Sequence, residues 1–387
     1  MKKQLFKTKS LLFLIVTVNI VAWNSTCFST ELMREAPEKY WDFSKLKDAP
    51  KYEKVNFKDS KFPNLETIMF EGMAVEGKPA PVFAYVGYPQ SPVPQGGFPS
   101  IVLVHGGGGT AFPRHVRFWN EKGFAVIALD WYNQRPIVNN NKVVKRVPLA
   151  GGKRQEHVVI VGNVILCTSL LRTLPKVNPD KIALVGLSWG SWYGAMVASV
   201  DPRLKGVIEI YLGDRKTDKS FINGRFLHAA RVPMYWVAGT NDRFATPESL
   251  QRAFDECPTI QNKSLVIELP HGDGGVTFES CVRMADYFLK GAPPLPKLGK
   301  AVLEKGIVTA DILQEGKGIK YAVLCYTTSS NEKIPHKRKW QSVPAQVKGK
   351  RVSAKLPSGT FQCFLSVYDQ QSEFNDCCGS SNVLFLQ

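Results

Sequence analysis

The sequence lacks the spacing patterns of several large classes of site. It holds eight cysteines, yet none forms a C-x-x-C pair or a Cys/His cluster with metal-ligand spacing. It has no G-x-G-x-x-G and no G-K-[ST] motif, which argues against a phosphate cradle. No internal repeat and no long low-complexity tract are present. These absences favour a globular protein that binds no metal and no nucleotide cofactor.

The N-terminus has the order of a secretory signal. Four lysines precede an apolar run over residues 11–23, and small polar residues follow at 24–30. The run is shorter than the roughly 20 residues that a spanning helix needs, so an uncleaved anchor is the weaker interpretation. Cys27 raises the alternative of a lipid-modified terminus, but no aliphatic residue precedes it at the usual place. We expect residues 1–29 to be a signal peptide and the chain to be secreted or periplasmic, without stable membrane insertion.

Removal of residues 1–29 with their four lysines lowers the net charge from +17 to about +13. A basic surface favours acidic partners, although it also serves solubility and non-specific binding of polyanions. Nucleic acid is not an expected partner of an exported chain. Seven cysteines remain after cleavage, so at least one stays unpaired even in an oxidising compartment. Cys257 and Cys281 flank one predicted strand and are able to meet, whereas Cys325 and Cys363 both lie in predicted strands.

The remaining chain divides into two predicted domains. Residues 30–291 alternate between predicted strands and helices, including a helix over 163–174, which indicates a mostly parallel sheet covered on both faces. The proline-rich residues 292–296 form a predicted linker, because proline cannot continue the preceding helix. Residues 297–387 show short strands of period two, which predicts a small all-β accessory domain of sandwich type. The predicted strands are 307–313, 321–326, 351–356, 361–368 and 382–385.

Ser188 lies in the pentapeptide G-L-S-W-G at 186–190. A serine nucleophile must be held on a sharp strand-to-helix turn, and this turn needs small flanking residues such as Gly186 and Gly190. The pattern alone arises by chance in many chains. Here a buried-type strand precedes it at 182–185 and an alanine-containing helical stretch follows, so we predict that Ser188 is a nucleophile.

Of the six histidines, His271 has the best setting for a general base. It follows a predicted strand over residues 264–269, and open α/β sheets place their sites beyond the carboxyl ends of strands. Asp242 follows the predicted strand 233–238 and is the preferred acid for orienting the imidazole. Asp214, which follows the strand before it, is the rival. The order Ser188, Asp242, His271 favours Asp242.

The glycine-rich loop over residues 105–109 follows another buried-type strand, at 101–104. Glycine allows a substrate to approach the backbone closely. We predict an oxyanion hole that includes the backbone of Gly107 and Gly108 in this loop and of Trp189 beside the nucleophile. A turn without function is the alternative for the glycines.

An insertion-like stretch over residues 131–155 carries five basic residues near the expected strand ends. One hypothesis is a basic rim that favours substrates with a carboxylate, and solvated loop charge is the preferred alternative. The five residues are Lys142, Lys145, Arg146, Lys153 and Arg154.

Taken with the motifs at 105–109, 186–190, 239–242 and 271–272, the chain resembles the secreted dienelactone-hydrolase-like and acetyl-xylan-esterase-like members of the α/β-hydrolase superfamily. The resemblance covers residues 66–291. It implies the α/β-hydrolase fold, a serine esterase with Ser188, Asp242 and His271 as catalytic triad, and no metal or organic cofactor. The implied partner is a small-molecule or polysaccharide ester, with an acidic substrate as one option.

The resemblance has one departure and leaves alternatives open. Dienelactone hydrolases proper have cysteine where this chain has Ser188, so lactone hydrolysis is not expected. The motifs also resemble secreted prolyl-oligopeptidase-type serine peptidases, whose propeller this chain is too short to contain. A different class of function is a non-catalytic protein that binds a glycan or the cell envelope through the C-terminal domain. The sequence carries no signal for an oligomeric state.

Overall fold

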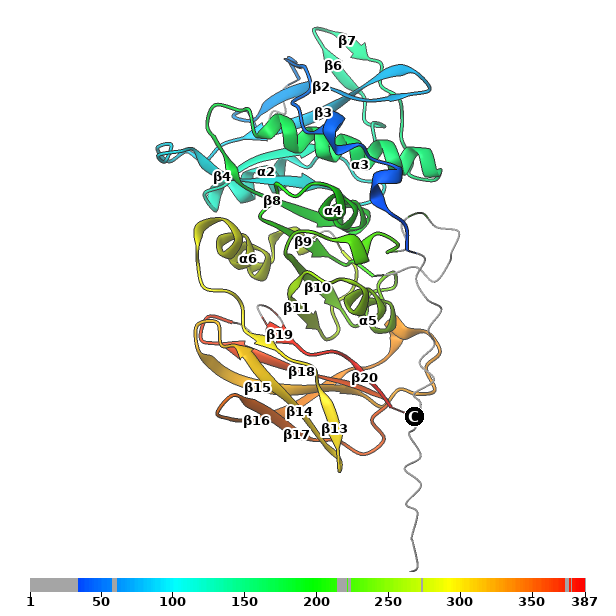
Figure 1. The fold of residues 1–387 in the computed structure, drawn as a ribbon, viewed down its shortest axis with the longest axis vertical. Helices are drawn as coiled ribbons and strands as arrows, with labels where there is room; N and C mark the ends of the chain where they lie inside the picture. Colours follow the sequence, from blue (N-terminus) through cyan, green and yellow to red (C-terminus); the bar gives the residue numbers. More distant parts are fainter. Residues whose placement is uncertain are drawn as a thin grey trace, which may run out of the picture. The chain divides into compact units, whose positions relative to one another are not determined.

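The computed structural model describes residues 34–57, 61–213, 221, 224–272, 274–372, 376 and 378–386. The predicted signal peptide, residues 1–29, lies outside them. The described residues belong to one compact unit. In this unit an α/β part is followed by an antiparallel β part, which we call the C-terminal module (Figure 1).

A nine-stranded sheet forms the centre of the α/β part, in the order β1-β2-β3-β5-β4-β8-β9-β10-β11. Strands β5 to β11 of this path pair in parallel, whereas β1, β2 and β3 are antiparallel. The strands are β1 (Tyr52–Lys54), β2 (Glu66–Val75), β3 (Lys78–Gly87), β4 (Phe98–Val104), β5 (Ala125–Leu129), β8 (Val177–Leu187), β9 (Gly206–Ile210), β10 (Met234–Gly239) and β11 (Ile260–Val266).

Helices cover both faces of this sheet, as Figure 1 shows. Successive strand residues alternate between two hydrophobic clusters: Val102 and Val104 pack in one, Ile101 and Leu103 in the other. The first cluster contains residues of α1 (Phe43–Leu46), α3 (Arg154–Leu171), α4 (Trp189–Val200) and α5 (Pro247–Glu256). The second contains residues of α2 (Pro113–Glu121) and α6 (Glu279–Lys290).

Two element boundaries differ from the sequence prediction. We expected a helix over 163–174, but α3 already begins at Arg154. The start was missed because apolar residues lie on all sides of α3, so its sequence shows no amphipathic period. The strand predicted over 264–269 is β11, which ends at Val266 and leaves residues 267–271 as a loop. The insertion-like stretch contains a small hairpin of β6 (Ile137–Asn139) and β7 (Lys142–Val144).

The C-terminal module is a continuous antiparallel sheet in the order β12-β14-β17-β16-β15-β18-β19, with β13 added to β14 and β20 to β18. It has a hydrophobic cluster of its own around Leu324 and Leu365. Its strands are β12 (Lys297–Leu298), β13 (Val302–Glu304), β14 (Ile307–Gln314), β15 (Ile319–Thr327), β16 (Gln341–Lys348), β17 (Arg351–Lys355), β18 (Gln362–Asp369), β19 (Cys378–Ser380) and β20 (Leu384–Phe385).

The junction between the two parts is packed and polar. Arg283 of α6 donates to both carboxylate oxygens of Asp369, at 3.0 and 2.6 Å, and Asp369 is fully buried. The amide of Asn262 donates to the carbonyls of Leu295 and Pro296, so the predicted linker is fastened to β11. Phe364 of β18 belongs to the same hydrophobic cluster as α3 and α4. The module is therefore part of the core that supports the α/β sheet.

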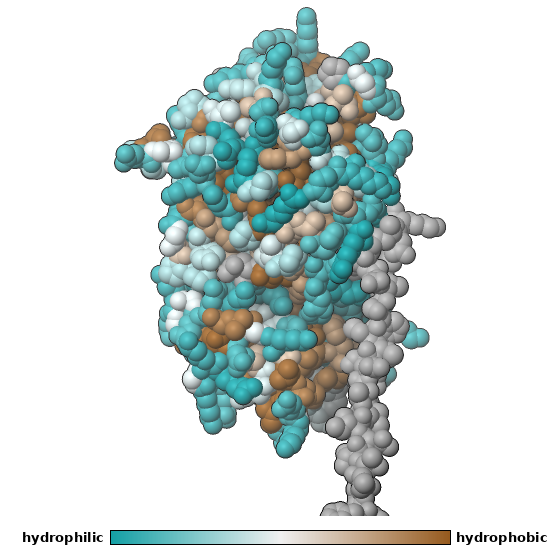
Figure 2. Space-filling model, in the orientation of Figure 1, coloured by the Kyte–Doolittle hydropathy of each residue, from teal (hydrophilic) through white to brown (hydrophobic). Residues whose placement is uncertain are grey.

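The six described cysteines are buried and free, including Cys257 and Cys281, so the contact considered for that pair does not form a disulfide. Within the described ranges, no helix has both the length and the apolar character to cross a membrane. The face drawn in Figure 2 is largely hydrophilic, with hydrophobic patches over the C-terminal module, where Val302, Ile307 and Leu313 are exposed.

Candidate active site

Four strands end at the same edge of the sheet and deliver the predicted site residues there. His105 follows β4, Ser188 follows β8, and Asp242 lies three residues beyond β10. His271 lies five residues beyond the end of β11. Parallel strands have their carboxyl ends at one edge, so residues far apart in the chain converge.

Ser188 lies on the sharp turn between β8 and α4, with φ 54° and ψ −114°. This left-handed conformation is strained for a residue with a side chain. It fits only because the neighbours are glycines: a Cβ on Gly190 would lie 2.0 Å from the carbonyl oxygen of Val104. A Cβ on Gly186 would lie 2.4 Å from the carbonyl oxygen of Gly190. The Ser188 N–H donates to the carbonyl of Ile210 over 2.9 Å and holds the turn against β9.

The imidazole of His271 lies between the serine and the acid. Its Nε2 is 2.9 Å from Oγ of Ser188, and its Nδ1 is 2.7 Å from Oδ2 of Asp242. The Tyr211 ring, 4.7 Å away between centroids, and the Phe244 ring, 4.9 Å away, pack against the imidazole. The structure therefore brings Ser188, His271 and Asp242 together in one hydrogen-bonded chain.

Asp242 is fully buried, and its two oxygens have different partners. While Oδ2 faces His271, Oδ1 accepts the backbone N–H groups of Phe244 and Ala245 at 2.7 and 3.1 Å. A buried carboxylate is stable when its lone pairs are used in this way. The rival acid Asp214 lies outside the described residues.

The glycine loop lies beside the serine. Gly107 and Gly108 line the same pocket as Ser188 and Trp189, so the four predicted residues share one wall. A Cβ on Gly107 would lie 3.1 Å from the Trp189 ring, and Gly108 has φ +71°, which favours glycine. Trp189 is the first residue of α4, so its backbone N–H lies at the positive end of the helix.

Residues 82–269 match the dienelactone hydrolase family. The acetyl xylan esterase of Paenibacillus sp. R4 has a similar structure, with a TM-score of 0.53 and 14% identity over 68% of this chain and 98% of that one. Acetyl Xylan Esterase 1 from Thermoanaerobacterium sp. JW/SL YS485 gives a TM-score of 0.45 with 16% identity, covering 63% of this chain and 90% of that one. A puromycin-hydrolyzing peptidase of Mycobacterium tuberculosis gives 0.47 with 17% identity, covering 60% and 40%. No curated protein matches at a significant level.

The chain has the α/β-hydrolase fold and is similar to the dienelactone hydrolase family over residues 82–269. This family indicates a serine hydrolase that acts on esters. The C-terminal module lies beyond the matched residues.

The pocket that Ser188 and His271 line has a volume of about 410 Å³, which is in the range of small-molecule sites. Besides the predicted site residues, its wall includes Tyr132, Trp192, Tyr211, Arg243 and Phe244. No sequence motif marked these five residues. Arg243 and Phe244 directly follow Asp242, so the rule that placed the acid at the strand end also pointed to them.

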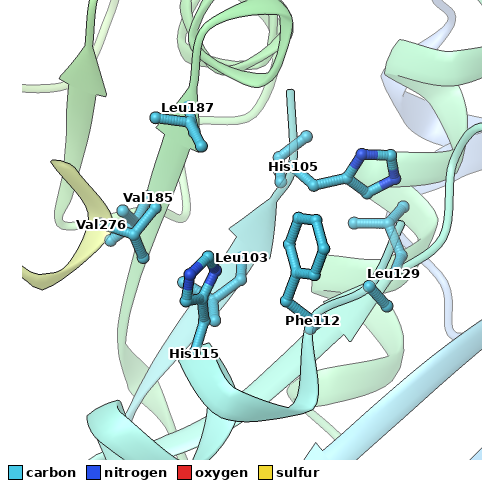
Figure 3. Close-up of a pocket in the computed structure, with 11 residues that line it drawn as sticks. Leu103, His105, Phe112, His115, Leu129, Val185, Leu187 and Val276 are labelled. Atoms are coloured by element: carbon cyan, nitrogen blue, oxygen red, sulfur yellow. The ribbon is translucent and has the colours of Figure 1, made fainter. Parts of the chain in front are cut away.

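The loop of the hydrolase at 105–109 rests on a second group of buried side chains. His105 Nδ1 lies 2.8 Å from the carbonyl oxygen of Gly106, and its ring stacks on Trp131 at 4.9 Å. Phe112 lies between His105 and His115 (Figure 3). These three residues border a cavity of about 20 Å³, roughly the space of one water molecule.

The basic stretch at 131–155 contributes less to the pocket of the hydrolase than the rim hypothesis requires. None of its five basic residues is among the residues that line the pocket beside Ser188. The side chain of Arg146 is buried and pairs with Asp130 over 2.8 Å. The guanidinium of Arg154 lies over the rings of Tyr40 and Phe221. Arg243 is the cation that reaches the pocket from the described residues.

The part of the chain that the structure describes holds no group of three or more histidine, cysteine or acidic side chains arranged to hold a metal.

Proposed function

We propose that this hydrolase is an exported carboxylic-ester hydrolase that acts through an acyl-enzyme on Ser188. The observation that carries the proposal is the position of His271, within hydrogen-bond distance of both Ser188 and Asp242. A nucleophile, a base and an orienting acid in this order are what acyl transfer requires.

In the first half-reaction, Ser188 Oγ attacks the ester carbonyl carbon while its proton passes to Nε2 of His271. Asp242 accepts the Nδ1–H of His271, which fixes the tautomer and stabilises the imidazolium. The tetrahedral intermediate then collapses, and the Nε2 proton leaves with the alcohol.

In the second half-reaction, water attacks the acyl group on Ser188 and gives a proton to Nε2. The carboxylic acid departs as Ser188 Oγ regains that proton. The negative oxygen in both halves lies near the backbone of Gly107, Gly108 and Trp189, and each donor of this kind is worth about 3 kcal/mol.

We propose acylated carbohydrates or small carboxylic esters as substrates. The pocket wall combines the indole rings of Trp189 and Trp192 with the phenol rings of Tyr132 and Tyr211. Aromatic faces of this kind bury the apolar faces of sugars and acyl groups, and phenol hydroxyls form hydrogen bonds with polar groups of a substrate. This composition supports a neutral or mildly polar ester, with Arg243 available to an acidic group.

The experiment is covalent labelling with a fluorophosphonate, followed by a screen of acetylated glycans, aryl esters and peptidyl amides. The wild type is expected to label and to hydrolyse esters, whereas Ser188→Ala loses labelling and about 10⁶-fold in kcat. Ser199→Ala is the matched control, because Ser199 is a buried serine of α4, the helix that follows Ser188, and its hydroxyl donates to the carbonyl of Met196 in the same helix. Absence of labelling in the wild type would refute the esterase, and faster turnover of amides than of esters would establish a peptidase instead.

Export is tested separately. We expect the full chain to appear outside the cytoplasm with its N-terminus near residue 30, and a chain without residues 1–29 to stay inside. An intact residue 1 on the exported protein would show an uncleaved anchor.

A further inference from the structure

Asn241, the neighbour of Asp242, is bonded to the C-terminal module. Its amide Nδ2 donates to the carbonyl of His336 over 3.0 Å and to the carbonyl of Arg338 over 2.9 Å. Both acceptors belong to the turn around η4 (Pro335–Lys337), which lies between β15 and β16 of the module. The loop that carries the acid is thus held by a segment about 95 residues further along the chain.

The same asparagine is linked to the loop that carries the histidine. Its Oδ1 accepts the hydroxyl of Thr240 over 2.7 Å, and that hydroxyl accepts the backbone N–H of Glu268 over 3.0 Å. Glu268 has φ 59°, a left-handed conformation that a residue with a side chain keeps only when its surroundings hold it. His271 follows three residues later, so this chain of bonds reaches both partners of Ser188.

The turn that accepts these bonds is itself anchored to the α/β part. The buried guanidinium of Arg338 donates to Glu248 in the first turn of α5, and Gln362 of β18 donates to the same carboxylate oxygen over 2.7 Å. Burial raises the pKa of Glu248, but the hydrogen bonds from Arg338 and Gln362 outweigh it and hold the pKa below its usual value. The acid loop lies between β10 and α5, so the module holds it at Asn241 and at Glu248.

We propose that the C-terminal module positions the acid and histidine loops, and that Asn241 is the positioning residue through which it does so. This role rests on the proposed function of Ser188. The geometry has a direct catalytic consequence, because a displacement of about 1 Å in a catalytic group can lower a rate about 100-fold. The module is then a working part of the esterase in addition to any glycan or envelope that it binds.

A matched pair of variants in the full chain separates positioning from mere stability. Asn262 has the same chemistry as Asn241, because its amide also donates to two backbone carbonyls, those of Leu295 and Pro296. It lies near the start of β11, at the opposite end of that strand from the loop that carries His271. We expect Asn241→Ala to lower kcat on an aryl ester at least tenfold while KM changes less than twofold. Asn262→Ala is expected to lower the melting temperature at least as much and to keep kcat within twofold.

A second pair tests the link to the histidine loop and remains informative if Asn241→Ala does not fold. Thr240→Val keeps the size of the buried side chain and removes both bonds of the hydroxyl, whereas Thr240→Ser retains the hydroxyl. We expect Thr240→Val to lose kcat at least fivefold and Thr240→Ser to recover it.

Two results would overturn the positioning role: wild-type kcat in both Asn241→Ala and Thr240→Val, or an equal loss of kcat in Asn262→Ala. Fluorophosphonate labelling of the wild type distinguishes these results from failure of the proposed function, because an unlabelled wild type refutes the esterase itself.

Discussion

Nη1 of Arg146 lies 2.8 Å from Oδ2 of Asp130, and both side chains are buried, at 2% and 0% exposed. The other oxygen of this carboxylate lies 3.6 Å from Nε2 of His105, the first residue of the glycine-rich loop at 105–109. Burial raises the pKa of Asp130, but His105 and Arg146 outweigh it and keep the pKa below its usual value. Arg146, which the sequence suggested was either part of a basic rim or solvated loop charge, therefore supports the loop from inside.

Substitution of Arg146 by methionine is expected to lower the free energy of unfolding by about 3–5 kcal/mol, because it removes the guanidinium that pairs with the buried carboxylate of Asp130. Urea denaturation measures the loss. Lys145→Met, at an exposed neighbouring position, is the control and should change stability by less than about 0.5 kcal/mol. Equal stability of the two variants would contradict the structural role of Arg146.

Substitution of Asp242 by asparagine is expected to lower kcat by about 10⁴-fold with little change in KM, because the amide no longer holds the required tautomer of His271. Steady-state kinetics on an aryl ester test this. Asp201→Asn is the control, since Asp201 is also fully buried but pairs with Arg203 at the end of α4. If Asp242→Asn retains more than a tenth of the wild-type kcat, then Asp242 is not the catalytic acid.

The position of Arg243 at the pocket predicts selectivity for substrates that carry a negative charge. Its side chain is exposed at the pocket, and no ion pair to it is found among the described residues. We expect Arg243→Gln to raise KM about 3- to 10-fold for an ester with a carboxylate beside the scissile bond, and to leave a neutral isostere unchanged. The effect should shrink in high salt, because the site is open to solvent.

Lys153→Gln provides the comparison for Arg243, because Lys153 is a basic residue of the stretch at 131–155 that does not line the pocket. An equal increase in KM for neutral and acidic esters would show that Arg243 does not select substrates by their charge.

The burial of Glu209 predicts that the stability of the protein depends on pH. It is fully buried in β9, neither carboxylate oxygen has a hydrogen-bond partner in the described structure, and burial raises its pKa well above the ordinary value. The folded protein therefore keeps the proton while the unfolded chain loses it above about pH 4.3. Stability falls as pH rises, by up to about 1.4 kcal/mol per unit, until the folded pKa is reached.

The variant Glu209→Gln carries no titrating group there, so its stability relative to the wild type should increase from pH 4 to pH 7. Urea denaturation at these two pH values measures the difference. A constant difference between the two proteins would show that Glu209 is ionised in the folded state.

Much of the site was predictable because its requirements are local. The two glycines around Ser188 and the strand before it follow from the sterics of a tight turn, and the pattern showed them without the fold. The placement of Asp242 and His271 after strands followed from the rule that parallel strands end at one edge. The predicted helix began later than α3 does, because a helix that is buried on all sides shows no hydrophobic period in its sequence.

Strand β16 was not predicted, since it is polar and contains Pro344. Residues Gln341 to Ala345 pair only with β15, and Gln346 to Lys348 pair with β17. Pro344 is therefore paired with a strand on one side only, like a residue of an edge strand. Proline is tolerated at such positions. Strand partners of this kind are decided by the neighbours, not by the strand itself.

By itself the sequence determined the nucleophilic turn, the glycine loop and the alternation of strands and helices, because these depend on residues close together in the chain. Only the tertiary structure decided which charges face the substrate, how Arg146 is used, and that Asn241 is held by the turn at 336–338. Those contacts join segments separated by tens of residues, so their energies depend on packing that no local pattern records.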